Sequence, residues 1–185
     1  MYATYGAFDK NIARQLNHLK IMFHTHSLPM KWVHSGLTAD LCAAYYAVEF
    51  AAKERREDAR ISPGEMSDIA RFVVNELFEN AVKFHSPGDI SIASGIVHRD
   101  IIFLISNVST RDRVVSFEGY LKKLMTEDVT SMLLERVEAS ALAGSTESGL
   151  GFLTLMSDYG VLLGWDLESV DKDTVQVKTM ACLSM

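Results

Sequence analysis

Two periodicities of apolar residues run along this chain, and they predict where its helices and strands lie. From Ser62 to about Phe84, apolar residues recur every three or four positions, which is typical of a helix with one buried stripe. Ser62 can cap this helix, Pro63 suits its first turn and Glu65 completes a capping box. A Ser-Pro-Gly sequence at 86–88 is expected to end it. The pattern therefore predicts one long helix with well-defined ends.

The second half of the chain contains four stretches with the pattern of strands. Residues 90–97 alternate and residues 101–108 are largely apolar, so the short polar connection between them predicts a hairpin. Residues 161–168 and 174–183 predict a second hairpin across the polar turn at 171–173. We therefore expect a sheet that contains these two hairpins.

The remaining segments predict further helices and one loop. A helix is expected over 41–53, two short helices within 116–142 and another over 150–158, after a loop of mostly Gly, Ser and Thr at 144–149. Residues 8–23 show a weaker helical periodicity. This order of elements predicts an α+β fold, a two-layer sandwich with helices packed on one face of a mixed sheet.

Length and composition fit one compact domain. The chain has 185 residues, of which 48% are hydrophobic, so it can bury a sizeable core. We expect an N-terminal helical extension over 1–61, packed on a core formed by 62–185. The two cysteines, Cys42 and Cys182, lie far apart without a CxxC pair, which argues against a disulfide framework or a structural zinc site.

The net charge of −6 argues against a nucleic acid as the main partner, because such binding uses clustered Lys and Arg. The chain shows neither the pattern of a signal peptide nor an apolar run long enough for a membrane span. We therefore expect a cytoplasmic protein without a membrane partner.

Three polar residues share one side of the predicted long helix. Glu76 and Asn80 are four positions apart, and Lys83 is three further on. The amide oxygen of Asn80 can bind Mg²⁺, the Glu76 carboxylate can accept a proton, and the Lys83 ammonium can neutralise a phosphate. An ordinary polar helix face with a Glu–Lys pair explains the same spacing about equally well.

A second motif precedes the helix at 150–158. The loop at 144–149 leads into Gly149-Leu150-Gly151, and glycines at the start of a helix allow phosphate groups to approach the backbone N–H groups. By itself this pattern also fits a plain loop with a glycine-assisted turn. It matches neither the phosphate-binding loop of NTPases nor a dinucleotide fingerprint.

The two motifs in this order resemble the GHKL ATPase superfamily, which has the Bergerat ATP-binding fold. The resemblance covers about Ser62 to the C-terminus. It implies that Asn80 coordinates Mg²⁺, that Glu76 is the general base and that Lys83 approaches phosphate. It also implies that the box Ser148, Gly149, Leu150, Gly151 and Phe152 belongs to the nucleotide site, with its glycines under the phosphates.

More narrowly, the stretches 75–84 and 148–154 look like small bacterial ATP-binding proteins, and the stand-alone serine kinases of partner-switching systems are the relatives expected to be nearest in function. This resemblance implies Mg²⁺–ATP as the ligand, with Glu76 activating a hydroxyl of a small anti-sigma-antagonist-like partner protein. Many of these proteins dimerise, so residues 1–61 are the expected surface of a homodimer.

The sequence departs from the superfamily at the Asp-x-Gly-x-Gly box, whose Asp contacts adenine. Asn107 stands at the position of the Asp, and Ser109 and Arg111 replace the glycines. The Asn107 side-chain oxygen can still accept a hydrogen bond from an amino group. This departure favours an alternative function, a non-catalytic nucleotide-sensing module with a degenerate adenine pocket. A third possibility is a scaffold that has the fold but binds no nucleotide.

Overall fold

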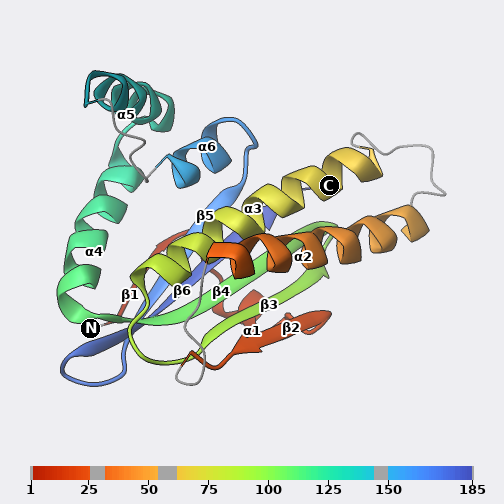
Figure 1. The fold of residues 1–185 in the computed structure, drawn as a ribbon, viewed down its shortest axis with the longest axis horizontal. Helices are drawn as coiled ribbons and strands as arrows, with labels where there is room; N and C mark the ends of the chain where they lie inside the picture. The colour runs from red at the N-terminus through yellow and green to blue at the C-terminus, as the bar shows by residue number, and fades with distance from the viewer. Residues whose placement is uncertain (1, 26–31, 54–61, 144–149, 185) are drawn as a thin grey trace.

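A six-stranded sheet with the strand order β1-β5-β6-β4-β3-β2 organises the protein (Figure 1). The computed structural model describes residues 2–25, 32–53, 62–143 and 150–184. The strands are β1 (Tyr2–Gly6), β2 (Leu19–Phe23), β3 (Ile90–Val97), β4 (Asp100–Thr110), β5 (Leu162–Ser169) and β6 (Thr174–Leu183). The helices are α1 (Lys10–Gln15), α2 (Trp32–Lys53), α3 (Pro63–Phe84), α4 (Arg111–Thr126), α5 (Val129–Ala143) and α6 (Gly151–Ser157).

The predicted α+β sandwich is confirmed, but the sheet is not mixed. All five pairings between the described strands are antiparallel. The two predicted hairpins, β3–β4 and β5–β6, lie side by side because β4 pairs with β6, and β1 and β2 add one strand to each edge. Each hairpin is antiparallel by itself, and the strands β4 and β6, which join the two hairpins, also run in opposite directions. The whole sheet is therefore antiparallel.

The N-terminal segment differs most from its prediction. Helix occupies only α1 within residues 8–23, and 19–23 is the edge strand β2 rather than helix. The predicted helical periodicity included Leu19 and Phe23, which are four positions apart. This spacing returns to the same face in a helix and also in a strand, so it does not distinguish the two. The segment expected to be a helical extension thus supplies both edge strands of the sheet.

The long helix α3 is confirmed, including its start. The Ser62 hydroxyl accepts a hydrogen bond from the Glu65 backbone N–H at 3.2 Å, and the Glu65 carboxylate accepts one from the Ser62 N–H at 2.9 Å. Two further helices, α4 and α5, follow β4 as predicted, although α4 begins earlier, at Arg111. Within the described ranges, no helix is long and apolar enough to cross a membrane.

Helices α2, α3, α4 and α6 cover one face of the sheet, and the main core lies between them. The alternation in β4 sends Ile101, Phe103 and Ile105 into this core. On the opposite face the short helix α1 packs with a smaller cluster around Leu16 and Ile102. The prediction that helices pack on one face therefore holds for the long helices, with α1 as the exception.

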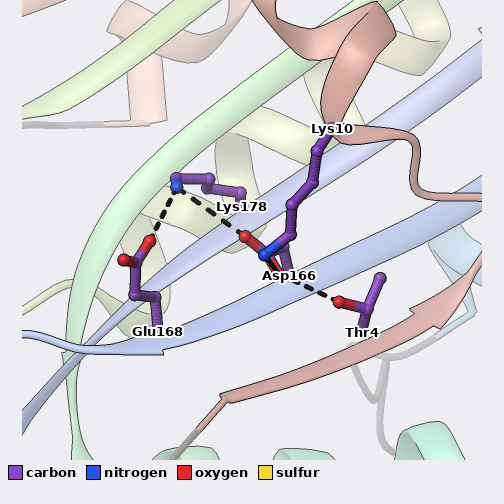
Figure 2. Close-up of polar contacts among 5 residues, drawn as sticks. All are labelled: Thr4, Lys10, Asp166, Glu168 and Lys178. Atoms are coloured by element: carbon purple, nitrogen blue, oxygen red, sulfur yellow. Dashed lines mark hydrogen bonds and ion pairs between the residues drawn. The ribbon is translucent and has the colours of Figure 1, made fainter.

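A charged cluster on the opposite face joins the N-terminal segment to the C-terminal hairpin (Figure 2). Asp166 in β5 is only 4% exposed, and it accepts a hydrogen bond from the Thr4 hydroxyl of β1 at 3.1 Å. Its carboxylate also pairs with Lys10 of α1 at 3.1 Å and with Lys178 of β6 at 3.7 Å. Lys178 in turn pairs with Glu168 at 3.1 Å. The buried carboxylate therefore has three partners that offset its desolvation.

Candidate functional site

A cavity of about 860 Å³ lies between α3, α4, α6 and the sheet. Seven described residues that the sequence predicted for one site, from α3, β4 and the start of α6, all line it: Glu76, Asn80, Lys83, Asn107, Leu150, Gly151 and Phe152. Ser148 and Gly149, predicted for the same site, lie outside the described residues. The cavity therefore joins two motifs that are about seventy positions apart in the sequence.

Glu76 occupies a position where α3 and α6 approach each other closely. A Cβ atom at Gly151, the first residue of α6, would collide with the Glu76 carboxylate. Burial raises the pKa of the Glu76 carboxyl above its ordinary value, and the negative charge of Glu79 raises it further. Gly151 thus leaves room at the wall of the cavity for the Glu76 carboxylate, whose affinity for a proton is increased.

Asn80 is oriented by its own helix. Its side-chain Nδ2 donates a hydrogen bond to the backbone carbonyl of Glu76 at 2.8 Å. The other end of the amide, Oδ1, is an acceptor without charge, which is the type of oxygen that a hard cation such as Mg²⁺ prefers. The hydrogen bond therefore fixes which end of Asn80 remains for a ligand.

Lys83 and Phe84 end α3 at the rim of the cavity. The Lys83 ammonium lies 5.2 Å from the centroid of the Phe84 ring, within the range of a cation–π contact. Phe84 is 44% exposed even though it is a large apolar side chain. The rim therefore offers a positive charge beside an exposed aromatic ring.

The sheet forms the floor of the cavity, and Asn107 is part of it. Asn107 is 6% exposed, and its Nδ2 makes a long hydrogen bond of 3.4 Å to the backbone carbonyl of Val108. The Ser109 hydroxyl donates to the carbonyl of Phe84 at 2.6 Å, so it supports the end of α3. The floor is therefore built from residues whose polar groups contact the backbone of the protein.

The Arg111 side chain is directed toward the β5–β6 turn. Its Nε donates to the Lys172 carbonyl at 2.7 Å, and its Nη2 donates to the Asp171 carbonyl at 2.8 Å. Two side chains thus have structural roles, since Ser109 supports α3 and Arg111 fixes a hairpin turn.

Several residues of the cavity were not predicted from the sequence. Thr179 of β6 lies on the floor, and the alternation of β6 places it on the same face as Val177, which pairs with Asn107. Tyr120 and Arg136 come from α4 and α5. The register of the hairpins carries a signal for Thr179, but α4 and α5 carry no local signal that distinguishes cavity residues from an ordinary helix face.

Replacing Glu76 by glutamine is expected to stabilise the fold at neutral pH. Because the pKa of Glu76 is raised by folding, the folded state keeps a proton that the unfolded state releases, and stability falls as the pH rises above about 4.5, the ordinary value. The loss is complete once the pH exceeds the folded pKa. Glutamine carries no such charge, so the stability difference should grow from pH 4.5 upward in urea denaturation.

The matched control is Glu79→Gln, on the same helix but exposed. This variant should show a smaller pH-dependent gain, which comes only from relieving repulsion of Glu76. A Glu76→Gln variant whose stability relative to the wild type is the same at pH 4 and pH 8 would contradict the assigned effect of burial.

The fold and cavity define a two-layer α+β sandwich with a polar and aromatic cavity between its helices and its sheet. No protein-family model and no curated relative matches this chain. One chain of the crystal structure of the SiaB–SiaC complex from Pseudomonas aeruginosa has a similar fold, with a TM-score of 0.62 and 13% sequence identity. The similarity covers 96% of this chain and 99% of that chain, so it extends over nearly the whole fold.

Proposed function

We propose that this protein binds Mg²⁺–ATP in the cavity and is a serine/threonine protein kinase that modifies a small regulatory partner. The observation that carries the proposal is the convergence of Glu76, Asn80, Asn107 and Gly151 on one cavity. Its volume of about 860 Å³ lies within the usual range for small-molecule sites. Such a site needs a proton acceptor, a cation ligand and a hydrogen-bond acceptor for the nucleotide base. It also needs a backbone segment that phosphate can approach closely.

The chemistry of the lining fits a metal-bound triphosphate. Asn80 Oδ1 is the atom that would hold Mg²⁺, and the Lys83 ammonium would lie beside phosphate oxygens. When bound, Mg²⁺ supplies positive charge that offsets the charge of the phosphates. We assign the base-binding role to Asn107 because its side chain is on the cavity floor.

Glu76 is suited to accept the proton of the attacking hydroxyl. The hydroxyl oxygen of the partner forms a bond to the terminal phosphorus, the bond from that phosphorus to the bridging oxygen breaks, and ADP leaves with the electron pair. The proton of the hydroxyl goes to the Glu76 carboxylate. A carboxylate with a raised pKa holds that proton better near neutral pH than an exposed one.

The proposed partner is a small anti-sigma-antagonist-like protein of a partner-switching or signalling system. The similar chain of known structure comes from a complex of two proteins, which supports an interaction of this kind. Residues 1–61 remain the proposed surface for a homodimer.

The test combines nucleotide binding with phosphotransfer. Glu76→Ala is expected to bind a fluorescent ATP analogue in the presence of Mg²⁺ within about threefold of the wild type, because binding relies on Asn80. The same variant should transfer labelled phosphate to a partner protein at least about 100-fold more slowly, since general bases contribute about 10²–10⁴-fold. The control is Glu79→Ala, which should keep most of the transfer activity.

A second function, a non-catalytic nucleotide sensor, is favoured by the floor of the cavity. Asn107 Nδ2 and the Ser109 hydroxyl both bond to the protein backbone, and neither brings the negative charge that the superfamily uses to recognise adenine. A wild-type protein that binds the ATP analogue but neither transfers nor hydrolyses phosphate would favour the sensor over the kinase. A protein that binds no nucleotide at millimolar concentration would exclude both.

A further inference from the structure

Positive charge gathers around the cavity although the chain as a whole carries a net charge of −6. Among the described residues that line it, the cations are Lys83, Arg113 and Arg136, and the carboxylates are Glu76 and Glu79. The positive side chains therefore outnumber the negative ones at this cavity. Such a local reversal of the overall charge attracts an anionic ligand.

The three cations differ in how they are held. Lys83 lies over the Phe84 ring, and Arg113 Nη1 donates to the backbone carbonyl of His85 at 3.4 Å. The guanidinium carbon of Arg136 lies 5.9 Å from the centroid of the Tyr120 ring. Contact with a ring uses the flat face of a guanidinium and leaves the N–H groups at its edge for other partners.

Within the part of the chain that the structure describes, no hydrogen bond or ion pair engages the Arg136 guanidinium. Tyr120, which supports it, is itself fixed by burial, and that burial raises the pKa of its hydroxyl. Arg136 thus lines the cavity with its guanidinium close to an aromatic ring and with no hydrogen bond to another described residue.

Arg136 lines the cavity from a different helix than the α3 residues do. It belongs to α5, which packs against α6 (Figure 1). Helix α6 begins with Gly151, beside the Glu76 carboxylate. Asn80 and Glu76 line the cavity from α3 instead. An anion held by the α3 residues would therefore have its far end near α5.

We infer that Arg136 is a specificity-determining residue, which binds the terminal phosphate and makes the site select a nucleoside triphosphate over a diphosphate. The inference rests on the proposed nucleotide site. A guanidinium can donate two parallel hydrogen bonds to one phosphate, and these charge-assisted bonds are lost when the terminal phosphate is absent. Loss of such bonds corresponds to about a 10- to 100-fold change in affinity.

The experiment measures displacement of a fluorescent ATP analogue by ATP and by ADP, both with Mg²⁺, for the wild type and for Arg136→Gln. The variant should bind ATP about 10- to 100-fold more weakly and ADP within about threefold of the wild type. The matched control is Arg14→Gln, an exposed arginine on α1 at the opposite face of the sheet, which should change neither affinity.

A second variant, Arg136→Lys, keeps the charge and the ring contact but removes the two-pronged donor, so its ATP preference should be intermediate. Equal weakening of ATP and ADP in Arg136→Gln, or wild-type affinity for ATP in both variants, would overturn the role of Arg136 and leave the proposed function standing. A wild-type protein that binds neither nucleotide would overturn the proposed function, and this inference with it.

Discussion

Asn80→Ala is expected to abolish Mg²⁺-dependent nucleotide binding, with affinity reduced at least about 100-fold. The substitution removes the uncharged oxygen that we assign to the metal, and metal ligands and their supports typically contribute 10- to 100-fold or more each. It also removes the hydrogen bond from Nδ2 to the Glu76 carbonyl, which orients that oxygen. Titration of a fluorescent ATP analogue with and without Mg²⁺ measures the effect.

The matched control is Asn75→Ala on the same helix. The Asn75 amide donates to the exposed Glu79 carboxylate at 2.9 Å, and the side chain does not line the cavity. This variant should therefore bind nucleotide like the wild type. Equal binding by Asn80→Ala and Asn75→Ala, at unchanged thermal stability, would remove Asn80 from the site and with it the metal assignment.

The elements that the sequence predicted well are those whose signals are local. The capping box at Ser62 and the apolar stripe that follows fix the start and the buried face of α3 within a few residues. Because Glu76 and Asn80 are one helical turn apart, their shared side follows from helix geometry alone. The hairpins were found for the same reason, since their alternation and turns are short-range features.

The features that the sequence did not predict depend on contacts between distant segments. The strands β1 and β2 are only five residues each, and they are strands because they find the free edges of β5 and β3. A segment this short has no period of its own that separates strand from helix. The place of Arg136 in the site likewise depends on how α5 packs, which no spacing within α5 reveals.

The side chains of Ser109 and Arg111 also make contacts with distant segments. Ser109 meets the end of α3, twenty-five positions earlier, and Arg111 meets the β5–β6 turn, about sixty positions later. A hydroxyl and a guanidinium here stabilise the frame around the floor of the cavity. The structure therefore assigns both positions to the frame around the cavity.

Trp165→Ala is expected to cost about 3–5 kcal/mol of unfolding free energy, which is the usual cost of truncating a buried tryptophan. Trp165 in β5 is fully buried and packs edge-on against two rings that line the cavity, Phe152 at 5.4 Å and Phe117 at 6.3 Å between centroids. Because small domains are stable by only about 5–15 kcal/mol, this loss should remove a large share of the total stability. Urea denaturation followed by circular dichroism measures it.

Trp165→Phe separates the packing of this side chain from its polar atom. The Trp165 Nε1 group is buried and has no hydrogen-bond partner among the described residues, so its removal by phenylalanine relieves an unsatisfied donor while most of the ring contact remains. We expect a loss of less than about 2 kcal/mol and unchanged nucleotide binding, since Phe117 and Phe152 keep a ring between them. A phenylalanine variant as unstable as the alanine variant would contradict the assignment of this stabilisation to the ring contacts with Phe117 and Phe152.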